Sequence, residues 1–272
     1  MLKVRLDLLL VDRGLAESRA KAQALIMAGQ VRVDGQVEIK ASAQIAPEAR
    51  LDLEMGPRFV SRGGDKLEAA LVAFPVDVSG CVCADVGAST GGFTDCLLQH
   101  AAARIYTIDV GKGLLHWKLR SDPRVVVMEE TNARYVKSLP EPVSLVTIDA
   151  SFISLKILLP VVKGWLSSFS SLPIFEENGG GQGGVLALIK PQFEAGRKES
   201  AKHKGVIRDP AVHKAILANI LTFAHAQGFG VRGLVRSPVL GPKGNVEFLA
   251  WLSLVYLEQT DFATLVDQVT LE

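Results

Sequence analysis

Hydrophobic residues recur with helical spacing at the start of the chain and with strand-like spacing soon after. The helical spacing predicts two short helices, one ending at Gly14 and one over residues 19–27 closed by Gly29. Ser18 precedes the second helix as an N-cap. Residues 31–37 then alternate around an Asp-Gly pair, which predicts a β-hairpin. These elements predict a small α+β module over residues 1–60.

A larger region follows a Gly/Pro-containing linker at about residues 55–64. A helix is predicted over residues 65–74 and another over 209–227, and apolar runs between turns predict strands. The seven predicted strands are residues 81–85, 103–110, 125–128, 143–149, 184–190, 231–235 and 246–254. The sequence therefore predicts an α/β domain over residues 61–272. The Gly/Ser-rich segment 167–184 is expected to be a mobile loop, and we assign it no chemistry.

Composition is that of an ordinary globular protein, with 48% hydrophobic and 22% charged residues among 272. The formal net charge of +1 provides no global attraction to nucleic acid. Charges interrupt the first apolar residues, and no apolar run is long enough to span a bilayer, so we expect a cytoplasmic protein. The three cysteines are too few for a disulfide framework and lack zinc spacing. Cys81 and Cys83 are interpreted as buried hydrophobic residues.

The candidate chemistry begins at residues 85–95, where a strand, a Gly-rich turn and a helix follow one another. Gly87 and Gly92 have the spacing of a P-loop, but Phe93 stands where that loop requires a lysine. A dinucleotide-binding G-x-G-x-x-G lacks its second glycine here. The ligand left by elimination carries an adenosine but no phosphate, as S-adenosylmethionine does; a tight turn without a ligand is the alternative. The predicted cofactor-binding residues of this turn are Asp85, Gly87, Ser89, Gly91, Gly92 and Phe93.

Polar residues also close the later strands. Asp109 lies about twenty residues beyond the turn, where an acid can accept hydrogen bonds from the ribose hydroxyls of an adenosine. Asn132 is placed to line the adenine, and Asp149, which ends the fourth strand, is a further predicted cofactor-binding residue. Lys190 ends the fifth strand. Lys66 lies in the first turn of a helix, where the helix dipole disfavours a positive charge. Because α/β sheets bind ligands at the carboxyl ends of their strands, these residues mark a candidate site.

The N-terminal module resembles the S4 RNA-binding domain. The resemblance rests on residues 5–7, 14, 18–19, 22, 26, 29–31 and 33–35. It implies binding to structured RNA, although the module holds nine Lys/Arg against eight Asp/Glu. RNA binding would therefore rest on a local patch of Arg5, Arg19 and Lys21, and the alternative is a solvated helix face. If this module is not the anchor, the basic stretch 197–204 is the next candidate.

The larger region resembles the TlyA family, called hemolysin A in older naming, within the FtsJ-like ribose methyltransferases. The matching stretches are residues 61–67, 85–95, 149–154, 189–194 and 241–248. The resemblance implies a seven-stranded methyltransferase core that transfers a methyl group from S-adenosylmethionine to a ribose 2′-hydroxyl. It also implies ribosomal RNA or a ribosomal subunit as partner. The family's Lys-Asp-Lys-Glu tetrad falls on Lys66, Asp149, Lys190 and Glu247.

These residue types suit the chemistry, because a ribose hydroxyl is a poor nucleophile that a base can activate. Lys190 is the candidate base if a desolvated pocket and a second cation, Lys66, favour its neutral form. Asp149 would orient Lys190, and Glu247 would position a lysine or the ribose. No metal is expected, and the five histidines, which show no ligand spacing, are interpreted as structural.

Two other functions remain open from the sequence. The older family name suggests a membrane-lytic protein, but the apolar segment 157–166 is too short to insert and contains a proline and Lys163. A non-catalytic RNA-binding factor of ribosome assembly is the other alternative, and the intact tetrad argues against it. The target nucleotide, the ribosomal subunit and the oligomeric state do not follow from the sequence.

Overall fold

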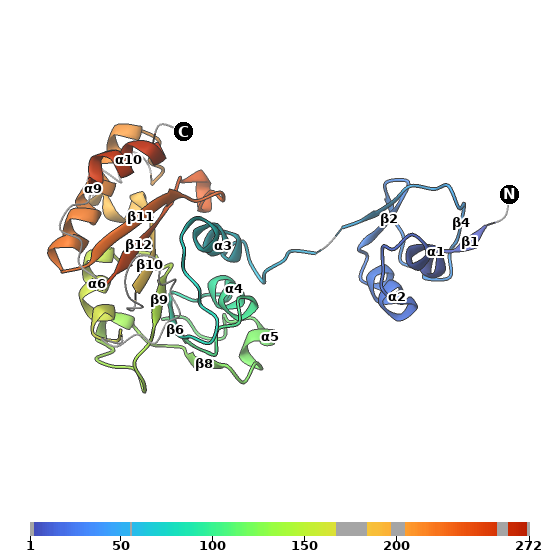
Figure 1. Cartoon of the computed structure of the whole chain (residues 1–272), viewed down its shortest axis with the longest axis horizontal. Helices are drawn as coiled ribbons and strands as arrows, with labels where there is room; N and C mark the ends of the chain where they lie inside the picture. The colour runs from blue at the N-terminus through green and yellow to red at the C-terminus, as the bar shows by residue number, and fades with distance from the viewer. Residues whose placement is uncertain (1–2, 55, 167–183, 197–204, 255–260, 271–272) are drawn as a thin grey trace. The chain divides into compact units, whose positions relative to one another are not determined.

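The computed structural model describes residues 3–54, 56–166, 184–196, 205–254 and 261–270. The chain divides into two compact units, Met1–Arg58 and Phe59–Glu272 (Figure 1). Two sequence-based assignments lie outside the described residues: the loop predicted over 167–184, apart from Gly184, and the basic stretch 197–204.

The first unit contains the predicted helices and hairpin around a small apolar core that includes Leu6, Leu10 and Ile26. The Ser18 hydroxyl accepts a hydrogen bond from the Lys21 backbone N–H, which confirms the predicted N-cap. Its helices are α1 (Leu6–Asp12) and α2 (Arg19–Met27), and its strands are β1 (Val4–Arg5), β2 (Val31–Val33), β3 (Gln36–Val37), β4 (Gln44–Ile45) and β5 (Leu51–Leu53). Strand β2 pairs with β3 and β5, and β1 pairs with β4.

The second unit is built on a seven-stranded sheet, which confirms the predicted α/β fold. Its strands are β6 (Val82–Val86), β7 (Arg104–Ile108), β8 (Val125–Met128), β9 (Leu145–Ile148), β10 (Gly184–Ile189), β11 (Gly230–Arg236) and β12 (Phe248–Ser253). The strand order is β11-β12-β10-β9-β6-β7-β8. Strands β6 to β10 are parallel, and β12 runs antiparallel to its neighbours β10 and β11.

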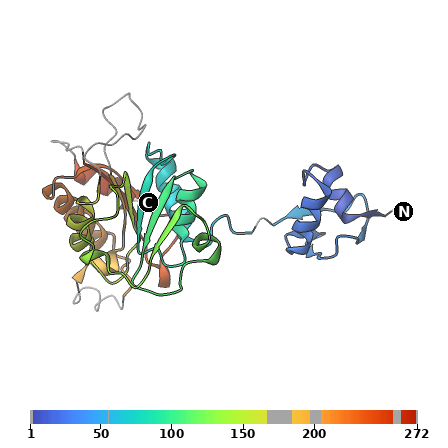
Figure 2. The same ribbon diagram turned by 90° about the horizontal axis from the view of Figure 1, so that it is seen from below.

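Helices cover both faces of this sheet (Figures 1 and 2). The helices α3 (Gly63–Ala73), α4 (Gly92–Gln99) and α5 (Trp117–Arg120) contribute to one core, and α6 (Leu155–Lys163), α9 (Pro210–Ala226) and α10 (Phe262–Thr270) contribute to the other. Strand β10 shows the alternation that this requires, because Val185, Ala187 and Ile189 face the α6 side while Leu186 and Leu188 face the α3 side. The short helices are η1 (Ala133–Tyr135), α7 (Pro191–Glu194) and η3 (Pro242–Gly244).

Helix α6 accounts for most of the apolar segment 157–166. Its Leu155, Leu158, Leu159 and Val162 are buried against the sheet. None of the described helices is both long and apolar enough to cross a membrane.

Strand β6 lies between β7 and β9, so the chain order reverses beside it. The loops that follow β6 and β9 therefore leave the sheet on the same edge and diverge to opposite faces. Open α/β sheets bind their ligands in the crevice formed at such a point.

Candidate active site

Two adjoining cavities open at this edge of the sheet. The Asp109 cavity, of about 590 Å³, is bounded by the ends of β6, β7 and β9 and by η1 and α6. The Lys66 cavity, of about 410 Å³, lies between the start of α3, the turn after β6 and the segment before η3. Gly87, Ser89, Asp149 and Ser151 line both cavities. Both volumes are in the range of small-molecule sites, so the edge can hold two ligand groups side by side.

Gly87 allows the two loops to approach each other at this junction. It has a φ of +82°, and a Cβ built there would lie 2.7 Å from the Asp149 carbonyl oxygen. The Asp149 backbone N–H donates to the Val86 carbonyl at 2.9 Å. A side chain at position 87 would therefore push Asp149 away from the turn.

The Asp109 carboxylate is fixed by two backbone N–H groups. Its Oδ2 accepts from the Ser89 N–H at 2.8 Å, and its Oδ1 accepts from the Gly111 N–H at 2.7 Å. An ionised carboxylate has about four acceptor positions, so each oxygen keeps one for a ligand. Apolar residues such as Val110, Leu114 and Ile157 line the same cavity. A carboxylate beside an apolar slot suits a ribose joined to a flat base.

The four tetrad residues form two ion pairs. Lys66 Nζ lies 2.6 Å from Glu247 Oε2, and Lys190 Nζ lies 2.6 Å from Asp149 Oδ1. The Lys190 ammonium also donates to Ser151 Oγ at 2.9 Å. Both lysines are only 7% exposed, so each charge is largely removed from water and depends on its partner.

Glu247 lies behind Lys66 and does not line the Lys66 cavity. It is fully buried, and a Cβ built on Gly241 would lie 2.1 Å from its Oε1. Among the described residues, no hydrogen-bond partner is found for this Oε1 atom. Of the two roles expected for Glu247, its contacts favour positioning of a lysine over contact with a ribose.

The sequence predicts that Asp85 contacts the cofactor, but the structure gives this residue a different position. It is fully buried and lines neither cavity. Its carboxylate accepts hydrogen bonds from the hydroxyls of Thr94 at 2.7 Å and Thr147 at 2.9 Å. Desolvation outweighs these bonds and raises the pKa of Asp85 to about 6. Asp85 therefore connects the start of α4 with β9 through these two hydrogen bonds, beneath the turn.

The other predicted cofactor residues divide between the cavities. Those that line the Asp109 cavity are Gly87, Ser89, Asp109, Asn132 and Asp149, and those that line the Lys66 cavity are Gly87, Ser89, Gly92, Phe93 and Asp149. Gly91 lines neither; its φ is +95°, and a Cβ there would lie 2.2 Å from Leu119 Cδ1. The Asn132 side chain caps η1 by accepting from the Arg134 N–H.

Sequence reasoning missed several residues that line the Lys66 cavity, among them Arg62, Ser151 and Pro242. Arg62 adds a cationic side chain at this cavity. All three lie inside stretches on which the family resemblance rests, so the resemblance could have identified them as site residues.

In the N-terminal unit, two of the three predicted RNA-binding residues meet on one buried carboxylate. Arg5 Nη2 lies 2.8 Å and Arg19 Nε 3.0 Å from Asp7 Oδ2, and Gln23 donates to the same oxygen. The Arg5 guanidinium bound to the carboxylate holds the pKa of Asp7 well below its usual range. Lys21 is exposed on the same helix as Arg19.

Residues 59–254 match the family described as FtsJ-like methyltransferase, and residues 4–51 match the S4 domain. The chain belongs to the FtsJ-like methyltransferase family. It is 48% identical over 257 residues to "Putative rRNA methyltransferase YqxC" of Bacillus subtilis, covering 92% of this chain and 85% of that one. It is 41% identical over 254 residues to the 16S/23S rRNA (cytidine-2′-O)-methyltransferase TlyA of Mycobacterium tuberculosis, covering 92% and 90%.

Among solved structures, this FtsJ-like methyltransferase is similar to "Putative hemolysin from Streptococcus thermophilus". The TM-score is 0.71 and the identity 40%, and the similarity covers all of this chain and 95% of the other. The predicted combination of an S4 domain with an FtsJ-like methyltransferase domain is thereby confirmed.

Proposed function

We propose that this protein methylates the 2′-hydroxyl of a ribose in ribosomal RNA, with S-adenosylmethionine as methyl donor. The observation that carries the proposal is the Lys190–Asp149 ion pair at the junction of the two cavities. The name of the Mycobacterium tuberculosis relative supports ribosomal RNA as the substrate and a cytidine as the modified nucleoside.

The Asp109 cavity fits the donor. Asp109 keeps acceptor positions for two ribose hydroxyls, the apolar residues beside it suit an adenine, and Gly87 and Ser89 bring backbone close to the ligand. No lysine stands in the turn to bind a phosphate, which agrees with a phosphate-free nucleoside. S-adenosylmethionine, when bound, supplies a methyl group activated on a positively charged sulfur.

The Lys66 cavity is the proposed place for the acceptor ribose. The tetrad carries two positive and two negative groups, so its formal charges cancel when all four are ionised. If Lys190 is neutral, the tetrad carries one net negative charge, and a cationic donor in the neighbouring cavity favours this state. Neutral Lys190 then accepts the proton of the 2′-hydroxyl, while Asp149 and Ser151 hold its Nζ in place.

Lys66 also lines the cavity proposed for the acceptor ribose. Its ammonium can donate a hydrogen bond to a ribose oxygen, and Glu247 fixes its position from behind. The S4 domain is proposed to hold the RNA through Arg5, Arg19 and Lys21 and so to deliver the nucleotide to the cavity.

Nucleoside mass analysis of ribosomal RNA tests the proposal. RNA from cells that lack the protein, from cells with wild-type protein and from cells with Lys190→Ala should be digested and its 2′-O-methyl nucleosides mapped. A 2′-O-methyl mark present only with wild-type protein is expected. Identical modification in all three would contradict the proposal and favour a non-catalytic assembly factor, and a methyl group on a base would contradict the ribose assignment.

A further inference from the structure

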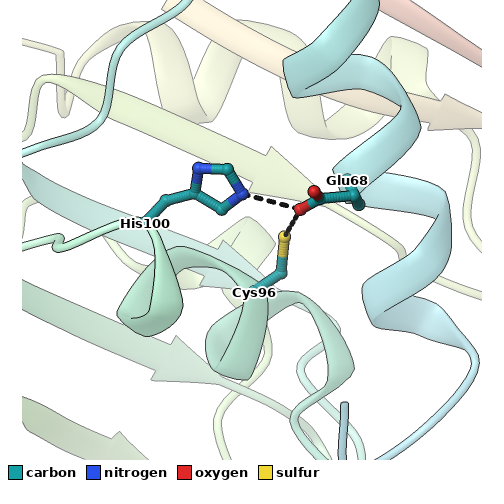
Figure 3. A group of neighbouring side chains, drawn as sticks. All are labelled: Glu68, Cys96 and His100. Atoms are coloured by element: carbon teal, nitrogen blue, oxygen red, sulfur yellow. Dashed lines mark hydrogen bonds and ion pairs between the residues drawn. The ribbon is translucent and has the colours of Figure 1, made fainter. Parts of the chain in front are cut away.

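Three side chains able to bind a metal ion meet between α3 and α4 (Figure 3). None of them lines either cavity. Glu68 comes from α3, Cys96 from α4, and His100 caps the C-terminal end of α4. One donor atom from each side chain lies within 4.8 Å of the other two. Cys96 and His100 share a helix face because they are four residues apart.

The donor types and distances suit zinc. Zinc sites in proteins combine thiolate, imidazole and carboxylate ligands in a tetrahedron, with Zn–S of about 2.3 Å and Zn–N or Zn–O of about 2.0 Å. These bond lengths place a sulfur and an oxygen ligand about 3.5 Å apart. Cys96 Sγ and Glu68 Oε2 are separated by 3.6 Å.

The His100 ring needs a small movement to complete the site. Its Nε2 lies 2.6 Å from Glu68 Oε2, whereas two such ligands of a tetrahedral zinc ion are about 3.3 Å apart. The ring can move outward by this difference, because the side chain is 34% exposed at the end of its helix. The Cys96 side chain is buried, so an ion would enter from the His100 and Glu68 side. With three protein ligands, a water molecule at that side would complete the tetrahedron.

We propose that Glu68, Cys96 and His100 bind one Zn²⁺ ion that fastens α3 to α4. Binding requires the Cys96 thiol to release its proton to solvent, so affinity falls as pH is lowered. The ion links the two helices and takes no part in the methyl transfer, since these residues do not line the cavities. This inference does not depend on the proposed function, and it departs from the sequence-based expectation that the chain binds no metal.

The position of the cluster gives the ion an effect on the active site. Glu68 is two residues beyond Lys66 on α3, and α4 begins directly after the turn that lines both cavities. The two helices already meet at their first turns, where a Cβ on Gly92 would lie 2.8 Å from the Gly64 backbone N. The metal adds a second fixed point one turn further along.

Metal binding by the full chain tests this proposal. Protein stripped with a chelator would be dialysed against Zn²⁺ and analysed for metal, and a parallel sample would be loaded with Co²⁺. We expect one ion per chain and, with Co²⁺, the charge-transfer absorption of a cobalt–thiolate bond. Cys96→Ser should lose that absorption. Cys81→Ser is the matched control and should keep it, because Cys81 is a buried cysteine whose Sγ contacts the carbonyls of Asp77 and Ser79.

His100→Gln provides a second variant in case Cys96→Ser does not fold. Loss of a direct ligand should weaken Zn²⁺ binding by more than the roughly 10- to 100-fold that loss of an outer hydrogen-bond partner causes. Wild-type protein that retains no stoichiometric ion, or a cobalt–thiolate band that survives Cys96→Ser, would overturn the proposal. The three side chains would then be a hydrogen-bonded cluster alone.

Discussion

Lys66 and Glu247 are 181 positions apart in the chain, yet their side chains form a buried ion pair of 2.6 Å. Lys66 faces the cavity proposed for the acceptor ribose, and Glu247 lies behind it with no exposed surface. Gly241 makes this arrangement possible, because any Cβ there would overlap the Glu247 carboxylate. The position of the lysine therefore depends on a glycine that does not line the Lys66 cavity.

Gly241→Ala should displace Glu247 and with it Lys66. A displacement of about 1 Å at a reacting group can cost on the order of 10²-fold in rate, so we expect a loss of that size in methylation. S-adenosylmethionine affinity should change little, because the Asp109 cavity lies on the other side of the junction. Single-turnover rates and calorimetry would measure the two effects. Gly164→Ala is the matched control, since its Cβ would come no closer than 3.4 Å to a neighbour; an equal rate loss there would contradict the explanation.

The buried Asp85 predicts a pH dependence of stability. Its pKa of about 6 lies above the ordinary value of 3.8, so the folded state retains this proton while the unfolded state loses it. The free energy of unfolding should therefore fall as pH rises from about 4 to 6, by about 3 kcal/mol from this group. Above pH 6 the contribution should be constant.

Asp85→Asn removes this titration and isolates it from other groups. Denaturant unfolding from pH 4 to pH 8 should show the wild-type protein losing stability relative to Asp85→Asn up to about pH 6. Parallel stability curves for the two proteins would show that Asp85 titrates normally, and the buried position would need another explanation.

Asp109→Ala should weaken S-adenosylmethionine binding. Loss of a hydrogen bond to a charged group costs about 1.5–3 kcal/mol, which is roughly ten- to more than a hundredfold in affinity. The structure adds that the Ser89 N–H would lose its acceptor, so the turn itself is expected to loosen. Calorimetry on folded protein would measure the change. Asp122→Ala, which removes an acid paired with Arg124 after α5, should leave affinity unchanged; unaltered affinity in Asp109→Ala would remove Asp109 from the site.

Lys21 offers the clearest test of RNA binding by the S4 domain. Reversing Arg19 would place a second carboxylate beside the buried Asp7, so its effect would mix folding with binding. Lys21→Ala should weaken RNA binding and flatten the log–log salt dependence by roughly 0.9 for a duplex phosphate, or about 0.7 for a single strand. A salt titration would measure both, with Arg50→Ala, another exposed cation of this unit, as control. Equal slopes for Lys21→Ala and wild type would move the RNA contact away from this helix.

The sequence predicts the seven strands and the residues at their ends. A parallel strand that is buried on both faces is a continuous apolar run in the sequence, and a polar residue follows where the strand ends. It does not predict the direction in which such a polar side chain points. Asp85 and Asp109 both stand at or near strand ends, yet Asp109 faces a cavity and Asp85 is buried beneath the turn.

Pairings between distant segments also could not be predicted from spacing. Asp7 pairs with Arg19 of α2 as well as with its near neighbour Arg5, and the contact with Arg19 depends on how α1 and α2 pack. The cluster of Glu68, Cys96 and His100 requires α3 to lie against α4. Helix α6 was not predicted from the sequence. It contains Pro160, a residue type that is unfavourable inside a helix, and this proline is exposed in the structure.

The most direct test of the catalytic proposal is a single-turnover methylation assay on ribosomal RNA with wild-type protein, Lys190→Ala and Lys214→Ala. Lys214 is the matched control, because it forms a 2.6 Å ion pair with Asp267 away from both cavities. Loss of a general base costs about 10²–10⁴ in rate, so Lys190→Ala should fall by at least that range while its cofactor and RNA affinities persist. Lys214→Ala should react as wild type does. A Lys190→Ala rate close to that of wild type would contradict the assignment of Lys190 as the base.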